Sequence, residues 1–297
     1  MTIVAANDDM MLARNVRTES RWHDFRRRLF RNKAATGGLV VVVVFFVLST
    51  LAPWLAPFDP INIDSLSALR PPGGAYLFGS DQYGRDVLSR VLYGGQISLI
   101  IGFISVAIAS LFGVTVGLIA GYYGGWADSV LMRVIDIMLA FPGILLSLAI
   151  VSMLGPNLRN LMIAVGISAI PTYARLTRGS VLSAREHLYV EAARTVGVPD
   201  HLIAIRHILP NVIAPIIVAA TLGVGTAIIV AAALSFLGLG SQPPQPEWGR
   251  MLSEGRPYLR DQWWISTFPG LAIMVVVLAI NLFGDGLRDA LDPRLKT

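Results

Sequence analysis

The chain contains no cysteine among its 297 residues. Disulfide bonds and thiolate metal sites are therefore excluded. The four histidines are His23, His187, His201 and His207, and no spacing among them is typical of a metal site. We therefore expect this chain to bind no metal ion.

Charge is also scarce. Only 14% of the residues are charged, compared with about 25% in a typical soluble domain. Hydrophobic residues make up 54%, and several apolar runs approach the roughly 20 residues that span a bilayer core. The net charge of +5 does not indicate a nucleic-acid partner, because the basic residues are dispersed along the predicted loops. The composition predicts an all-α, multi-span membrane protein in contact with lipid.

Six apolar segments are predicted to cross the membrane: 34–56, 97–120, 130–154, 161–174, 211–236 and 267–283. The first follows a basic tail of residues 1–33; it is too long for a secretory signal, and no small-residue cleavage site ends it. The fourth is short, but without it the basic segment 175–210 would lie outside. Under this topology the cytosolic segments hold 17 of the 24 lysines and arginines, which places both termini in the cytosol.

Two patterns within the spans predict their packing. Gly113, Gly117 and Gly121 recur every four residues on one helix face, where another helix can approach closely. Pro142 lies inside the third predicted span and is expected to kink it. We assign the three glycines a packing role and no chemistry.

The sequence lacks an energy source for transport. A P-loop needs Gly-Lys followed by Ser or Thr, but the two lysines, Lys33 and Lys296, follow Asn32 and Leu295. No ionisable residue lies in the middle of a predicted span, which disfavours a proton- or ion-coupled carrier. No Ser/His/Asp or paired-carboxylate arrangement sits at one membrane depth. We therefore expect no catalytic residue and no bound cofactor, and any transport would need an external motor.

The first outer segment covers residues 57–95. Asp81, Arg85 and Asp86 are interspersed there with apolar residues, as in a short amphipathic helix at the membrane interface. The alternative is a solvated outer loop.

The second outer segment covers residues 237–266. It contains Glu247 and Trp248, followed by a charged stretch that is predicted to be helical. Trp263 and Trp264 are expected to anchor it at the membrane interface.

A polar island, residues 191–210 with the sequence EAARTVGVPDHLIAIRHILP, stands between two apolar segments. It is predicted to form two short helices with a break. Gly197 suits the left-handed stop of the first helix, and Pro199 suits the start of the second.

The second helix of the island is expected to present one apolar face. Leu202, Ile205 and Leu209 fall on that face at helical spacing, and Pro210 is expected to end the unit. A compact hairpin at the membrane surface can present a docking surface to a soluble partner. The alternative is an ordinary surface hairpin.

The island resembles the EAA motif of bacterial ABC importer permeases: Glu-Ala-Ala, three residues, Gly, nine residues, Ile, one residue, Leu-Pro. His207 stands where the motif has Ile, and Ile208 follows it. In that family the motif forms the coupling helices, here residues 187–210, which dock into a cytosolic ATPase subunit. The matching positions are Glu191, Ala192, Ala193, Gly197, Leu209 and Pro210.

The resemblance extends from Trp22 to the C-terminus. The chain resembles the second permease subunit of bacterial dipeptide/oligopeptide importers. This implies a type I importer transmembrane domain at 96–285, preceded by one extra N-terminal helix and followed by a cytosolic tail at 286–297. The motifs are Gly-Arg-Asp at 84–86, FLGLGSQPP at 236–244, EWG at 247–249, FPG at 268–270 and GDGLRDALDP at 284–293.

The resemblance implies ATP-driven alternating access in the bacterial cytoplasmic membrane. The expected partners are a homologous second permease, one or two cytosolic ATPase subunits that bind ATP and Mg²⁺, and an extracytoplasmic peptide-binding protein. Asp81, Arg85, Asp86, Glu247 and Trp248 are the candidates for contact with that binding protein. The pattern assigns no residue to the substrate path.

Two alternatives stay open at this point. Permeases with these motifs carry dipeptides, D-alanyl dipeptides, oligopeptides, glutathione or nickel chelates, and the motifs do not separate these substrates. A membrane scaffold or channel, whose hairpin only anchors a cytosolic protein, is the alternative from another class. A permease gene is expected beside genes for a binding protein, a second permease and ATPases.

Overall fold

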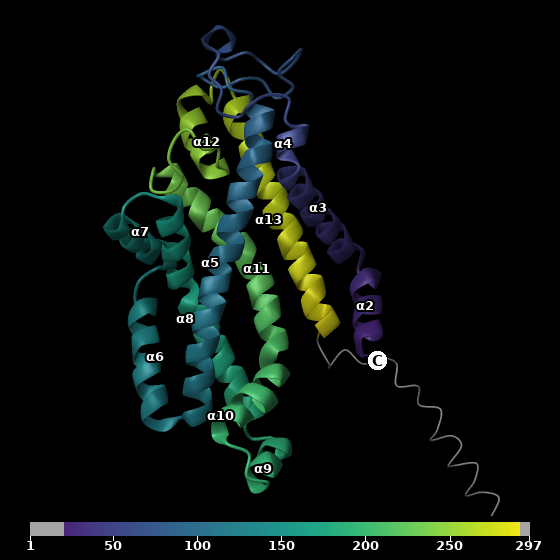
Figure 1. Ribbon diagram of the computed structural model, residues 1–297, viewed down its shortest axis with the longest axis vertical. Coiled ribbons are helices and arrows are strands. Elements are labelled where there is room, and N and C mark those ends of the chain that lie inside the picture. Colours follow the sequence, from purple (N-terminus) through teal and green to yellow (C-terminus); the bar gives the residue numbers. More distant parts are fainter. Residues whose placement is uncertain (1–20, 292–297) are drawn as a thin grey trace, which may run out of the picture.

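A computed structural model describes residues 21–291, with side chains from residue 26 onward. Within that range the chain is helical almost throughout and contains no strand (Figure 1). The remaining residues of both predicted tails lie outside the described part. The helices are α2 (Arg21–Arg31), α3 (Lys33–Thr50), α4 (Ala52–Leu55), η2 (Ser65–Ser67), α5 (Val87–Tyr123), α6 (Gly125–Leu139), α7 (Gly143–Leu154), α8 (Leu158–Ala184), α9 (Leu188–Thr195), α10 (Asp200–Leu202), η3 (Ile203–Ile208), α11 (Leu209–Phe236), α12 (Trp248–Gly255), η4 (Arg256–Tyr258) and α13 (Trp264–Leu291).

Four helical segments are long and apolar enough to cross a membrane: α3, α5, α13 and the continuous segment Asp200–Phe236 that ends with α11. Helices α6 and α7 add a fifth if they count as one span, although they are bent by 89°. The bend lies at Pro142, which confirms the predicted kink. Helix α8 contains the predicted fourth span but does not pass the same test. The all-helical class is confirmed, whereas six spans and cytosolic termini stay predictions.

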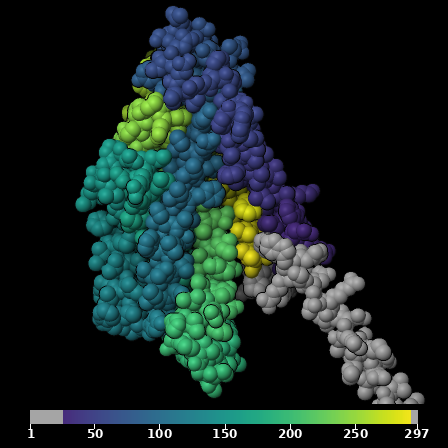
Figure 2. All heavy atoms as spheres, in the orientation of Figure 1, coloured from purple at the N-terminus to yellow at the C-terminus, as the bar shows by residue number. Residues whose placement is uncertain are grey.

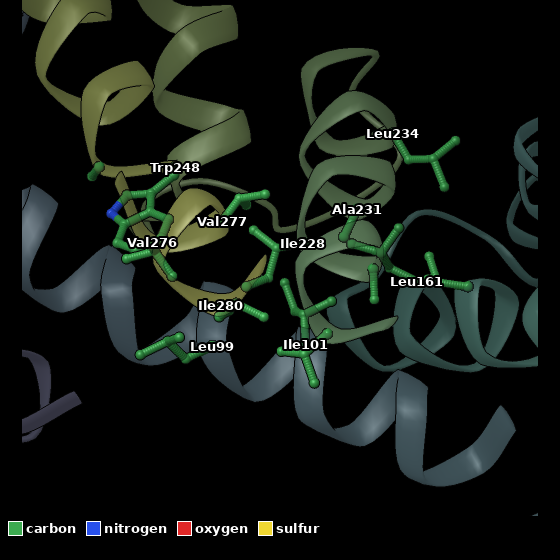
Figure 3. Packing of buried hydrophobic residues seen from close by; sticks show 14 of the residues in the cluster. Leu99, Ile101, Leu161, Ile228, Ala231, Leu234, Trp248, Val276, Val277 and Ile280 are labelled. Carbon is green, nitrogen blue, oxygen red and sulfur yellow. The ribbon is translucent and has the colours of Figure 1, made fainter. Parts of the chain in front are cut away.

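Helix α5 is the central helix of the bundle. It has 37 residues and is therefore about 55 Å long at 1.5 Å per residue, well beyond the roughly 30 Å of a bilayer core. The predicted span 97–120 is only its middle part. Helices α8, α11, α3 and α13 all pack against α5. The core gathers apolar side chains from several of these helices, among them Ile101, Ile228 and Val277 (Figure 3).

The three glycines at four-residue spacing lie on the face of α5 that meets α8, which confirms the predicted packing. A Cβ at Gly113 would lie 2.5 Å from the Cβ of Tyr173, and one at Gly121 would lie 2.9 Å from the Cβ of Val181. A Cβ at Gly117 would collide with the carbonyl oxygen of Ala174. The two backbones therefore touch along this face.

Replacing Gly117 with valine is expected to force α5 and α8 apart and to destabilise the chain. Overpacking of this kind costs about 1–3 kcal/mol, because backbone atoms cannot move aside as a flexible side chain does. Gly37→Val is the matched control, since Gly37 lies in a spanning helix with nothing within 4 Å of an added Cβ. The thermal unfolding midpoint in detergent should fall for Gly117→Val and not for Gly37→Val. If the two variants had the same unfolding midpoint, the contact between α5 and α8 at Gly117 would not be tight.

Candidate functional site

The predicted hairpin protrudes from one end of the bundle, beyond the other helices, as Figures 1 and 2 show. Helix α9 ends at a backbone turn in which Gly197 has φ +84°. The N–H of Gly197 donates to the carbonyl of Arg194 at 2.9 Å, and the N–H of Val198 donates to that of Ala193 at 3.1 Å. This is the Schellman arrangement, which favours glycine at the left-handed position. The predicted break is confirmed.

The second arm of the hairpin differs from the prediction. Pro199 precedes α10, and Asp200 lies in its first turn. The helix does not end at Pro210, because it continues without a break from Asp200 to Phe236. Residues 203–208 form a π-helix, whose wider turns shift the hydrogen-bond register. Pro210 follows directly after the π-helix, at the start of α11.

The π-helix also changes which residues are buried. Ile203 and Ile208 are fully buried, and they are five residues apart, which is the i to i+5 hydrogen-bond spacing of a π-helix. Ile205 is 55% exposed, and Leu202 and Leu209 are only half-buried. The predicted apolar face of Leu202, Ile205 and Leu209, which assumed an α-helical repeat, is therefore wrong.

The six motif residues divide between surface and interior. Ala193 is buried and Leu209 is half-buried, so both help to hold the hairpin in place. The apolar position that the motif gives to Ile is filled one residue late, by the buried Ile208 rather than by His207. The exposed motif residues are Glu191, Ala192, Gly197 and Pro210.

The hairpin is fixed to the end of α5. The Tyr122 hydroxyl donates to Oδ1 of Asp200 at 2.5 Å, and the Arg194 guanidinium lies 5.7 Å from the centre of the Tyr122 ring. Just before the hairpin, at the end of α8, Arg185 Nη1 donates to the carbonyl of Gly121 at 3.1 Å. A small apolar core, separate from the main one, lies beneath these contacts. A force on the hairpin therefore reaches α5 directly.

Large apolar side chains are exposed on the hairpin. Leu188 is 80% exposed, Val196 is 83% exposed, and Ile205 adds to the same end of the molecule. Leu188 and Val196 belong to the hairpin around α9, which protrudes from the bundle in Figure 1. Exposed apolar groups rimmed by polar residues mark sites of protein interaction. The exposed apolar groups at this end are suited to contact with another protein.

At the opposite end of the bundle lie the five residues that were expected to contact the binding protein. They are buried, so that expectation is wrong for this conformation. A docking protein cannot reach their side chains in this conformation. Helix α5 starts only at Val87, so no separate amphipathic helix lies at the interface. The five are Asp81, Arg85, Asp86, Glu247 and Trp248, each at most 4% exposed.

Two of these buried residues, Asp81 and Arg85, take part in a network of ion pairs that compensates their charges. Arg85 pairs with Asp81 at 2.6 Å and with Glu254 of α12 at 2.9 Å. Glu254 also pairs with Arg90 of α5 at 3.2 Å and with Arg250 at 3.1 Å. One carboxylate thus bridges three guanidinium groups. The network joins the loop before α5, α5 itself and α12.

The two other buried carboxylates cap helices. Asp86 accepts from the N–H of Ser89 at 2.7 Å at the start of α5. Glu247 accepts from the N–H groups of Gly249 and Arg250, both at 2.9 Å, at the start of α12. Burial raises the pKa of both carboxyl groups, because it disfavours the charged form. These roles are structural.

Two tryptophans tie the same end together. Trp248 Nε1 donates to the carbonyl of Val91 at 2.9 Å, and Trp264 Nε1 donates to that of Ser80 at 3.1 Å. Trp264 is buried, so the interfacial position expected for it is wrong, whereas Trp263 is exposed. The indole N–H of Trp264 donates to a carbonyl group in the loop before α5, so it does not need a partner at the membrane surface.

A cavity of about 350 Å³ lies among α5, α7, α8 and α11, and the sequence patterns did not indicate it. Its lining contains hydroxyl groups but no charged side chain. Across residues 21–291 no cluster of His, Asp and Glu is placed to hold a metal. The hydroxyl-bearing residues of the lining are Ser105, Ser168, Thr172, Tyr173 and Thr226.

Comparison with known proteins gives a consistent result. Residues 113–297 match the family described as binding-protein-dependent transport system inner membrane component, and residues 20–72 match the N-terminal transmembrane domain of oligopeptide transport permease C. The chain is 48% identical to a dipeptide transport system permease protein of Alkalihalophilus pseudofirmus, over 94% of this chain and 91% of that one. It is 45% identical to a glutathione transport system permease protein of Pectobacterium atrosepticum, over 96% and 94%.

A solved structure shares the fold. The inward-facing MetNI methionine ABC transporter matches with a TM-score of 0.54 and 20% sequence identity. The match covers 69% of this chain and 98% of that one. At this identity the likeness concerns the fold alone, and it confirms the type I importer arrangement of the helices.

Proposed function

The chain belongs to the family of binding-protein-dependent transport system inner membrane components, and we propose that it carries short peptides into the cell. It is a multi-span permease subunit of an ABC importer in the bacterial inner membrane. The similar proteins are permeases for dipeptides and for glutathione, which is itself a tripeptide. A short peptide backbone is the chemistry that these substrates share.

The protruding hairpin carries the proposal. A permease without a P-loop needs an ATPase partner, and the exposed Leu188, Val196 and Ile205 give such a partner an apolar surface to bind. ATP and Mg²⁺ would be bound by one or two ATPase subunits, while this chain is non-catalytic. A homologous second permease and an extracytoplasmic peptide-binding protein complete the proposed complex.

The contacts of the hairpin give a route for coupling. Closure of the ATPase dimer would move α9 and α10. The hydrogen bond between Tyr122 and Asp200 would pass this movement to α5, and the continuous helix from Asp200 to Phe236 would pass it to α11. Since α5 is packed along α8 by a glycine face, these helices would move together. The spans would thereby open on one side and close on the other.

Uptake into proteoliposomes tests the proposal. The chain, reconstituted with its second permease and ATPases, should accumulate a labelled dipeptide against its gradient. Accumulation should require both ATP and the binding protein, because ATP hydrolysis and the capture of external peptide are assigned to the partner subunits. A scaffold would give no flux, and a channel would give downhill flux without ATP. Either result would contradict the proposal.

A further inference from the structure

The cavity among α5, α7, α8 and α11 is suited to a small neutral or zwitterionic ligand. Its volume of about 350 Å³ is at the lower end of the roughly 300–1,000 Å³ of small-molecule pockets. Apolar side chains such as Val106, Ile144 and Val230 form much of the wall, and no charged group is among them. The helices that enclose the cavity lie next to one another in Figure 1.

Two threonines in the lining are unusual among the exposed threonines of the spanning helices. Thr50 and Thr115 donate to the carbonyl four residues earlier, at 2.7 Å each, which is how a hydroxyl is satisfied in lipid. Thr172 and Thr226 are exposed and make no hydrogen bond with any residue in the part of the chain that the structure describes. Their hydroxyls suit a surface that meets water or a polar ligand.

Tyr173 adds a phenol held in place by two glycines. A Cβ at Gly223 would collide with the Tyr173 hydroxyl, and a Cβ at Gly113 would lie 2.5 Å from its Cβ. The hydroxyl donates to the carbonyl of Ala219 at 3.4 Å, which is a long bond. The ring is therefore fixed by packing, and its hydroxyl oxygen keeps lone pairs to accept a bond from a ligand.

We propose that this cavity is where the subunit contacts the peptide midway through the membrane, with Thr172, Thr226 and Tyr173 bonding to the amide groups of the peptide. This inference rests on the proposed function. A hydroxyl both donates and accepts, so it matches the N–H and C=O groups of any peptide bond. A wall without charges offers no ion pair to an acidic or a basic side chain, so it does not select between the two signs of charge. Selection here is by length and bulk.

Removal of the two free hydroxyls tests the contact. Thr172→Val and Thr226→Val keep the side-chain volume and remove only the hydroxyl. In the reconstituted complex the double variant should lose about tenfold in maximal dipeptide uptake, with unchanged peptide affinity of the binding protein. Thr115→Val is the matched control and should transport normally, since its hydroxyl bonds within its own helix. Normal uptake by the double variant would overturn the inference.

Cysteine labelling tests the contact by a second measurement, the accessibility of single thiols in the cavity, which does not depend on the uptake rate. The chain has no cysteine, so Thr172→Cys and Thr226→Cys each introduce one thiol. A charged thiosulfonate reagent should modify both, and saturating dipeptide should slow the reaction several-fold, whereas Thr115→Cys should not react. Unreactive or unprotected thiols in a complex that transports peptide would overturn the inference and leave the proposed function intact. Failure of the unaltered complex to take up any peptide would instead overturn the proposed function.

Discussion

Replacing Gly197 with aspartate, or Glu191 with lysine, is expected to abolish ATP-driven uptake while the chain still inserts into the membrane. Nothing lies within 4 Å of a Cβ added at Gly197, so its only structural cost is the left-handed backbone with φ +84°. That cost is about 1–2 kcal/mol. Glu191 is exposed, and its carboxylate makes no ion pair within residues 26–291.

We expect the large effect to arise at the proposed docking surface of the hairpin. Both residues lie beside exposed apolar groups of the hairpin, Val196 next to Gly197 and Leu188 one turn before Glu191. A new charge that is buried against a partner without an opposite charge costs several kcal/mol. We therefore expect the ATPase subunit to dissociate and uptake to fall at least a hundredfold. Co-purification of the ATPase and transport in proteoliposomes measure the two steps.

Matched controls separate docking from folding. Gly155→Asp introduces the same residue at a φ of +91°, also with nothing within 4 Å, but in the turn between α7 and α8. Asp261→Lys reverses an exposed charge in the segment between α12 and α13. Both should transport normally. Normal uptake by Gly197→Asp and Glu191→Lys would contradict the proposed docking role of the hairpin.

Local rules predicted much of the fold from the sequence. The left-handed turn at Gly197, the bend at Pro142 and the glycine face of α5 all depend on backbone properties of single residues or on one helical repeat. Such properties act over a few neighbouring residues, so they can be inferred from the local sequence. The apolar runs likewise indicated helices, although α5 proved longer than its apolar middle.

The parts that sequence reasoning missed depend on distant partners. Arg85 looked like the polar side of an interfacial helix, but its partner Glu254 is 169 residues away. The cavity combines residues from four helices, none of which forms a pattern by itself. The π-helix at residues 203–208 is a third case. Its wider turn changes which side chains point toward the core, compared with the pattern that an α-helical repeat predicts. Tertiary contacts decide all three.

Replacing Glu254 with glutamine is expected to cause a large loss of stability. Its carboxylate bridges Arg85, Arg90 and Arg250 at 2.9–3.2 Å, and Arg90 is only 1% exposed. An amide offers one acceptor and turns two N–H donors toward guanidinium groups that are themselves donors. Breaking a buried ion pair by removing one partner costs about 3–5 kcal/mol, because uncompensated charge is left inside.

Asp136→Asn is the matched control, because it makes the same chemical change in an exposed pair. Asp136 and Arg175 are 2.7 Å apart, yet their side chains are 53% and 57% exposed, and such pairs contribute at most about 1 kcal/mol. The thermal unfolding midpoint in detergent should therefore fall by about 10 °C for Glu254→Gln and barely for Asp136→Asn. Protease cleavage in the loop before α5 should rise only in the first variant, since Arg90 also donates to the carbonyl of Pro60 in that loop at 3.1 Å. If Glu254→Gln instead reduced uptake with an unchanged midpoint, the network would act in binding a partner rather than in holding this end of the bundle together.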